Sequence, residues 1–316
     1  MRDGPRPAFR PIALSHASRL ILERLDAWRG LPVSPIETVQ VSQRGRFGRT
    51  QLTARDAGVP ALGYVVDYGA LLEGLRQRLT TPIAEHEPQA AGCVVHAEGA
   101  AADAGRPYGQ HAVVANVRFS KRAGTTAHER FTPEGPLALL PFDGRYAIVW
   151  SMSPARAEAL AASAPNVFLR ALAEAAGGAL GWPEALAERS VHPLSLRVRR
   201  TRVAPREAFI GNAAQMLHPV AGQGLNLALR DAWTLAEVLR EARDPGDAAV
   251  LGRYARARRA DATATVGITD LLAQVFVARG PLVGAARSLA LAGLEVLPPA
   301  RRFFARRMIY GPSAFP

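Results

Sequence analysis

Apolar positions recur at helical spacing near both ends of the chain and alternate in the middle. The spacing predicts helices over 12–28 and 68–79. From Asp247 onward the remainder reads as helical, with breaks at Gly280-Pro281 and Pro298-Pro299. One more helix starts after a glycine-rich loop, and its apolar face consists of Leu225, Leu229, Ala232, Leu235 (or Ala236) and Leu239.

The middle of the chain has the two-residue alternation that is typical of strands. A strand pair is predicted over 38–52 around the turn 44–48, and one helical insertion is predicted at 153–176. The remaining predicted strands are 61–66, 93–95, 112–117, 127–131, 137–141, 146–151, 194–200 and 208–210. A β-rich middle between α/β-like ends indicates two domains built from discontinuous segments.

Composition and charge narrow the class of protein. The 316 residues are 48% hydrophobic and 21% charged, which is typical of a folded chain with a sizeable core. The net charge of +12 comes from evenly spread arginine, because Lys121 is the only lysine. Without a recognition-helix motif or an aromatic RNA platform, a nucleic-acid binder ranks last among the functions considered.

Cysteine and histidine usage excludes several kinds of site. With Cys93 as the only cysteine, the chain has no intramolecular disulfide and no cysteine-type zinc site, so a reducing cytoplasm is the expected compartment. The histidines lack metal-ligand spacing, and no GxSxG or P-loop motif is present. We expect no secretory signal in residues 1–10 and no membrane span, since no apolar run reaches about 18 residues.

The densest chemical signal lies between 209 and 232. Gly211 follows a short strand, where a residue without a Cβ allows a tight turn and the close approach of a ligand. Pro219 stiffens the following loop, and Gly222 and Gly224 free the backbone amides at the start of a helix. A helix N-terminus carries unpaired N–H groups and partial positive charge, so it suits an anion or a developing negative charge.

The whole string resembles the second flavin-binding motif of the single-component aromatic hydroxylases, which have the p-hydroxybenzoate hydroxylase fold. Its wording, with Asn212 followed by Ala-Ala-Gln and Leu-His-Pro, resembles the ubiquinone-biosynthesis branch that contains the 2-polyprenyl-6-methoxyphenol hydroxylases. The chain has no GxGxxG, has Glu98-Gly99 where the branch has Asp-Gly, and is short between 80 and 91. Other segments that match the branch are 10–15, 41–48, 62–66, 108–110 and 129–136.

The resemblance implies an α/β (mixed α+β) FAD-binding fold with an antiparallel-sheet substrate domain and C-terminal helices. The FAD domain would comprise 1–34, a shortened 66–106, and 205–243 with the second flavin motif. The substrate domain would comprise 35–65 and 107–204, followed by a helical region at 244–316.

The resemblance also assigns candidate residues. Arg10 would contact the FAD phosphates, and Gly211 with Asn212 would hold the ribityl chain. Glu98 is either a weak contact at the dinucleotide edge or a solvated surface residue, and His218 either transfers protons or packs the loop. The residues predicted to line the pyrimidine edge of the flavin are Pro219, Gly222, Gln223, Gly224, Leu225 and Asn226. The candidates for the substrate chamber, each with an ordinary core role as the alternative, are Phe47, Tyr64, Pro141 and Trp150.

The implied activity is that of an FAD-dependent monooxygenase, reduced by NADH or NADPH, which hydroxylates a polyprenylated phenol of ubiquinone biosynthesis through a flavin C4a-hydroperoxide. The alternative is a non-catalytic homologue that serves as a binding or scaffold subunit. Partners implied by the resemblance are the phenol itself, a ubiquinone-biosynthesis complex and a membrane surface. Arginines at 301, 302, 306 and 307 interleave with apolar residues, which fits either a membrane-surface helix or the solvated face of a docked one.

Overall fold

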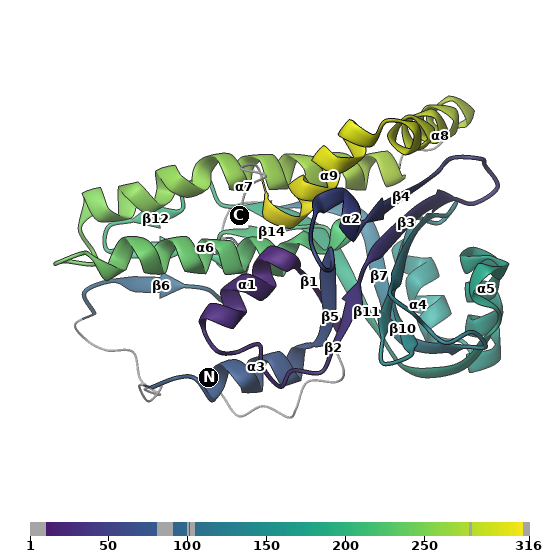
Figure 1. Ribbon diagram of the computed structural model, residues 1–316, viewed down its shortest axis with the longest axis horizontal. Coiled ribbons are helices and arrows are strands. Elements are labelled where there is room, and N and C mark those ends of the chain that lie inside the picture. Colours follow the sequence, from purple (N-terminus) through teal and green to yellow (C-terminus); the bar gives the residue numbers. More distant parts are fainter. Residues whose placement is uncertain (1–10, 81–90, 100, 102–104, 278–279, 312–316) are drawn as a thin grey trace.

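The computed structural model describes residues 11–80, 91–99, 101, 105–277 and 280–311, and Figure 1 shows the arrangement of its elements. Arg10 lies outside these residues. The largest element is an eight-stranded sheet in which only β3 and β8 run parallel. Its strands, in spatial order, are β14 (Gln215–Met216), β11 (Pro183–Val198), β7 (Arg106–Phe119), β10 (Arg145–Met152), β9 (Pro136–Phe142), β8 (Thr126–Phe131), β3 (Thr38–Gln43) and β4 (Arg49–Thr53).

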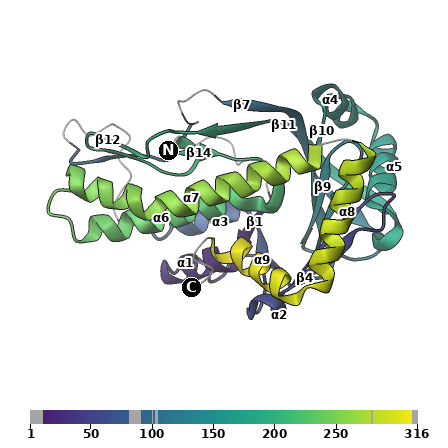
Figure 2. The same cartoon turned by 90° about the horizontal axis from the view of Figure 1, so that it is seen from above.

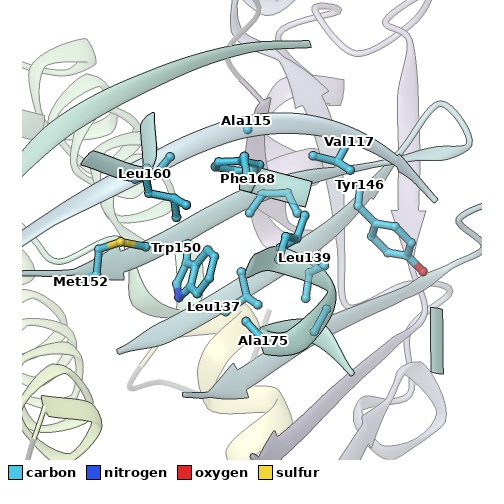
Figure 3. Close-up of a cluster of buried hydrophobic side chains, with 14 of the residues drawn as sticks. Ala115, Val117, Leu137, Leu139, Tyr146, Trp150, Met152, Leu160, Phe168 and Ala175 are labelled. Atoms are coloured by element: carbon cyan, nitrogen blue, oxygen red, sulfur yellow. The ribbon is translucent and has the colours of Figure 1, made fainter. Parts of the chain in front are cut away.

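One face of this sheet is covered by α4 (Pro154–Ala162) and α5 (Pro165–Ala176). The largest hydrophobic cluster lies between the sheet and these two helices. In it, Trp150 and Leu137 from the sheet pack with Phe168 from α5 (Figure 3). The residues of this cluster alternate along each strand, so the other set of side chains faces the rest of the molecule. Each face of the sheet therefore has its own role, one structural and one turned toward the candidate site.

A second group of elements surrounds the start of the chain. A three-stranded antiparallel sheet has the order β1 (Pro11–Ser15), β5 (Gly63–Asp67) and β2 (Val33–Ile36). A second small sheet has the order β12 (Val203–Ala204), β13 (Glu207–Phe209) and β6 (Val94–His96), with β6 and β13 parallel. The helices of this group are α1 (His16–Arg24), α2 (Ala54–Ala57), α3 (Tyr68–Arg76) and α6 (Gln223–Arg240).

The predicted start of the first helix was wrong by four residues. Residues 11–15 pair as β1 with β5, and α1 begins only at His16. Ser15 is the N-cap, and its side chain accepts a hydrogen bond from the amide of Ser18 at 3.2 Å. The pattern Ile12, Leu14 suits a strand as well as a helix over so short a run, and strand pairing decides between them.

Three helices complete the chain: α7 (Ala248–Val277), α8 (Pro281–Val296) and α9 (Pro298–Tyr310). Helices α6 and α7 lie side by side (Figure 2). The breaks predicted at Gly280-Pro281 and Pro298-Pro299 are confirmed, because a proline starts both α8 and α9. Within the described ranges no single helix is both long enough and apolar enough to cross a membrane. Helices α8 and α9 reach that length and hydropathy only together, as a pair bent by 99°.

Candidate functional site

The candidate site is built around the cradle loop, residues 217–224, which connects β14 to α6. Ala221 and Gly222 both have left-handed backbone conformations, with φ of 63° and 60°. The Gly222 amide donates to the Pro219 carbonyl at 2.9 Å, and the Val220 amide donates to Nδ1 of His218 at 3.1 Å. A left-handed alanine is energetically unfavourable, and such strain persists where surrounding contacts hold the backbone, often at a functional site.

Glycine stands at positions 211 and 224 of the site for different structural reasons. Gly211 lies two residues after the end of β13 and has a left-handed φ of 55°. A Cβ on Gly211 would lie 3.4 Å from the Ala228 Cβ on α6. Gly224 is exposed and a Cβ on it would meet nothing within 4 Å, so the first turn of α6 borders open space. Asn212 is exposed next to Gly211. The first turn of α6 is thus open at Gly224, and Asn212 is exposed beside Gly211, which packs against α6 at Ala228.

Asn226 and Gln223 hold the cradle loop from inside. The Asn226 oxygen accepts from the Ser15 amide at 2.8 Å and from the Ser18 hydroxyl at 2.7 Å, and its nitrogen donates to the carbonyls of Ala13 and Gly222 at 3.1 and 2.7 Å. These four bonds use the full capacity of the amide.

The Gln223 side chain donates to the carbonyls of Ala221 and Met308, both at 3.2 Å, and Leu225 packs against the core of α1 and β5. These placements argue against direct ligand contacts by the side chains of Gln223, Leu225 and Asn226. Their role in this structure is to position the loop.

His218 belongs to the loop packing. Its side chain is buried, and its ring meets the Tyr108 ring edge to face, with 4.9 Å between the centroids. Its Nε2 donates to the side-chain oxygen Oε1 of Gln110 at 3.4 Å. Burial lowers the pKa of His218 to about 4, so the imidazole is neutral near pH 7. A neutral ring with both nitrogens engaged supports the packing alternative over proton transfer.

An apolar cluster joins the cradle loop to the large sheet and to the last helices, and we call it the interface cluster. Val220 from the loop packs there with Phe131 from β8 and Ala273 from α7. The partly buried members of the interface cluster are Val41, Tyr108, Leu272 and Leu291. Val41 and Tyr108 belong to the large sheet, on the face opposite α4 and α5, whereas Leu272 belongs to α7 and Leu291 to α8.

The four predicted substrate residues do not come together. Phe47 is 72% exposed in the β3–β4 turn, and Tyr64 is buried beneath α1, where Arg19 donates to its hydroxyl at 2.5 Å. Trp150 and Pro141 project from the face of the large sheet that α4 and α5 cover. Trp150 belongs to the hydrophobic cluster under these helices (Figure 3), and Pro141 pairs with Tyr146 of that cluster. This placement argues against substrate contacts by Trp150 and Pro141.

The remaining predicted contact, Glu98, is exposed beyond the end of β6. This position fits the interpretation of Glu98 as a solvated surface residue. The cradle loop itself fits the pyrimidine edge of a flavin, since Gly224 leaves room at the positive end of an 18-residue helix.

Sequence reasoning missed Glu129 of β8. This carboxyl shares a face of the sheet with Val41, its partner in β3, and with Phe131 two residues further along β8. Burial raises the pKa of Glu129 to about 7. The signal was present in the sequence, because Ala127, Glu129 and Phe131 occupy alternate positions and a charged residue interrupts an apolar phase.

Comparisons with known proteins identify relatives of this chain. The ubiquinone hydroxylase UbiL of Rhodospirillum rubrum is 37% identical over 204 residues, which are 63% of this chain and 48% of that protein. The 3-demethoxyubiquinol 3-hydroxylase of Escherichia coli is 29% identical over 334 residues, which are 92% of this chain and 84% of that protein.

The fold has a solved counterpart. The p-nitrophenol 4-monooxygenase PnpA of Pseudomonas putida superposes with a TM-score of 0.76 over 96% of this chain and 88% of that chain, at 14% sequence identity. The predicted mixed α/β class with a sheet domain and C-terminal helices is therefore confirmed. The model of a family described as "FAD binding domain" matches residues 75–269, which is more than half of the chain. The protein belongs to this FAD-binding family.

Proposed function

We propose that this protein is an FAD-dependent monooxygenase that hydroxylates a polyprenylated phenol in ubiquinone biosynthesis, with NADH or NADPH as the reductant. The family match supports FAD as the cofactor. The names of the two enzyme relatives, a ubiquinone hydroxylase and a 3-demethoxyubiquinol 3-hydroxylase, support the phenolic substrate class. The observation that carries the proposal is the strained cradle loop with open space at Gly224, directly beside the interface cluster.

The residues divide the work by position. Gly211, Asn212 and Gly224 would hold the flavin at the N-terminus of α6, whose dipole favours negative charge on the bound ring. FAD, when bound and reduced by NADH or NADPH, would activate molecular oxygen, of which one atom is transferred to the phenol and the other leaves as water. The interface cluster excludes water and offers an apolar surface to the substrate ring, so the phenol is oriented beside the cradle loop.

The first test is binding of FAD, followed by visible absorbance and tryptophan quenching. Gly224→Val places a branched side chain in the open space at α6, and we expect about a tenfold or greater loss of FAD affinity, equivalent to about 1.4 kcal/mol or more. The matched control is Gly267→Val in α7, where a Cβ also meets nothing within 4 Å. The control should bind FAD as the wild type does.

The second readout is oxygen uptake with NADH or NADPH and a prenylated phenol, with mass spectrometry of the product. Addition of one oxygen atom to the ring supports the proposal. A protein that binds the phenol and takes up no FAD would instead support the alternative, a non-catalytic binding or scaffold subunit. Equal FAD affinity of the two glycine variants would contradict the assignment of the cradle loop.

We also propose that the protein docks on the cytoplasmic surface of a membrane, where a polyprenylated substrate resides. Helix α8 supports this with an outward apolar stripe at helical spacing, in which Leu282, Leu289 and Val296 are 84%, 65% and 73% exposed. The β3–β4 turn with exposed Phe47 and Arg46 packs against α8, where a Cβ on Gly48 would lie 2.5 Å from the Ser288 Cα. Exposed apolar residues next to arginine are typical of an interfacial surface.

A further inference from the structure

Glu129 is a carboxyl group that the assignments above leave without a role. It extends from β8 between Val41 of β3 and Ala138 of β9, which are its direct partners in the sheet. Side chains of paired residues project to the same face, so Glu129 lies on the face of the interface cluster beside Phe131. Within the described ranges no hydrogen bond or ion pair of its carboxylate is found.

The surroundings of Glu129 are partly closed. The residue keeps some accessible surface, and burial raises its pKa to about 7. Its sheet partner Val41 and its neighbour Phe131 both belong to the interface cluster, which also contains Val220 of the cradle loop. Glu129 therefore lies, partly accessible, beside the residues that connect the sheet to the cradle loop.

The charged groups on this side of the sheet do not neutralise Glu129. Arg287 of α8 lies over the Phe131 ring, 4.7 Å from its centroid, and donates to the Val275 carbonyl at 2.6 Å. Asp270 of α7 is engaged by Arg106 and by the Tyr108 hydroxyl, the latter at 3.0 Å.

His218 of the cradle loop is neutral near pH 7, as its lowered pKa indicates. The neighbours of Glu129 along β8, His128 and Arg130, project to the other face of the sheet. A buried carboxyl without a cation is expensive to keep, which points to a use for it at an active site.

We propose that Glu129 is a catalytic base that accepts the proton of the phenolic hydroxyl of the bound substrate. In this step the phenolic O–H bond breaks, the proton binds a carboxylate oxygen of Glu129, and the bonding electron pair stays on the phenolic oxygen. The total charge of the pair is unchanged. The resulting phenolate carries more electron density on the ring, which favours attack on an electrophilic oxygen. The proposal rests on the proposed function for its substrate class.

The test uses 4-nitrophenol as the probe, because its phenolate is yellow and its phenol is colourless. Wild-type protein should bind it with one proton shared between the phenol and Glu129. From about pH 7 to about pH 9 both groups lose their protons and repel each other, so the wild-type affinity should fall about tenfold or more. Glu129→Gln cannot ionise, and its affinity should change less than about threefold over the same range.

The variants also separate catalysis from structure. For Glu129→Gln we expect kcat to fall about 100-fold with little change in KM, and the rise of kcat around pH 7 to disappear. Glu129→Asp keeps a base one carbon shorter, and it should retain the rise of kcat with pH at an intermediate rate. Glu174→Gln, an exposed glutamate on α5, is the matched control and should behave as the wild type does.

The outcomes distinguish this proposal from the proposed function. Equal pH profiles for 4-nitrophenol binding in the wild type and Glu129→Gln, or no binding by either, overturn the role of Glu129. Hydroxylation by Glu129→Gln at the wild-type rate and pH profile also overturns it, while the monooxygenase function stands. If the protein takes up no FAD but binds 4-nitrophenol with the Glu129-dependent profile, the proposed function fails and the proton-accepting role of Glu129 stands.

Discussion

Two buried side chains near the cradle loop have pKa values displaced in opposite directions from their ordinary ranges. Burial lowers the pKa of His218 to about 4 and raises that of Glu129 to about 7. Both shifts have the same physical origin, because desolvation disfavours the charged form of either group. Each residue is therefore neutral over part of the range in which its exposed counterpart would be charged, and each leaves a different mark on stability.

The residue-scale prediction is a pH-dependent difference in the free energy of unfolding. The folded pKa of His218 lies below its unfolded value of 6.5, so its contribution is present above 6.5 and is lost as the pH falls toward 4. Between about pH 7 and about pH 5, the wild type should lose about 2 kcal/mol relative to His218→Gln. Urea unfolding at both pH values measures this difference.

Glu129 supplies the control of opposite sign. Its folded pKa lies above the unfolded value of 4.5, so its contribution is present below 4.5 and is lost as the pH rises through 7. The wild type should therefore lose up to about 2 kcal/mol relative to Glu129→Gln between about pH 5 and about pH 7. The same sign for both variants would contradict the burial of one of the two side chains, and the direction of the change would identify which one.

At the scale of elements, α6 and α7 are joined by a buried network of charges. Asp231 of α6 is fully buried and accepts from Arg258 of α7 at 2.7 Å, from Arg202 at 3.1 Å and from Gln215 of β14 at 2.7 Å. Asp261 of α7 continues the network and is bound by Arg230 and Arg258. The helix that follows the cradle loop is thus anchored to its neighbour by paired, buried charges.

Asp231→Asn should destabilise the protein by about 3–5 kcal/mol, because buried Arg258 and partly buried Arg202 lose their shared carboxylate. The matched control is Glu241→Gln at the end of α6, whose partner Arg240 lies at 3.6 Å with both side chains 75% exposed. That substitution should change the free energy of unfolding by less than about 1 kcal/mol. Guanidinium unfolding compares the two, and equal effects would contradict the buried role of Asp231.

The elements that the sequence predicts well are those with strong local signals. The glycine–proline breaks around α8 and the apolar face of α6 follow from residues within one or two helical turns. The predicted single helix 153–176 is instead two helices, because Ser163 is extended and Pro165 starts α5. β11 begins at Pro183, eleven residues before the predicted strand, since its first half is polar and gains its order from pairing with β7.

The candidate site divides in the same way. The cradle loop was predictable because glycine and proline carry backbone information in the sequence itself. The substrate face was not, since Trp150 and Phe131 both occupy alternating strands and only the register of the sheet shows which face each one takes. The four hydrogen bonds of Asn226 depend on contacts with residues 13–18, more than 200 positions away, and no local pattern contains them.

At the scale of the whole molecule, the C-terminal helices leave a large apolar surface uncovered. In Figure 1, α8 lies at the edge of the molecule, beside the β3–β4 turn and next to the C-terminal end of α7. The stripe Leu282, Leu289 and Val296 is exposed, and Leu297 and Phe303 further along the chain are also exposed, at 55% and 65%. Arg46 and Arg302 are exposed beside this surface. Soluble surfaces rarely concentrate apolar side chains to this degree, so an apolar partner is expected.

The whole-molecule prediction follows from the energetics of that surface. Burying one leucine is worth about 1.5–3 kcal/mol, so each of Leu282→Ser and Leu289→Ser should lower partition onto vesicles about tenfold or more. Vesicles with phosphatidylglycerol should bind more protein than phosphatidylcholine vesicles and lose it at high salt, since nearby arginines contribute about 1 kcal/mol each. Leu79→Ser, which removes a leucine that is 56% exposed three residues after α3, is the matched control for flotation measurements.

The competing occupant of this stripe is a second copy of the chain, and the same variants distinguish it. Self-association through α8 would make sedimentation depend on protein concentration, and the serine substitutions would abolish that dependence in the absence of lipid. Bilayer docking predicts the reverse pattern, in which the variants sediment as the wild type does and differ only when vesicles are present. Because Leu79→Ser removes an exposed leucine elsewhere, any loss confined to the α8 variants identifies this surface rather than general hydrophobicity as the contact.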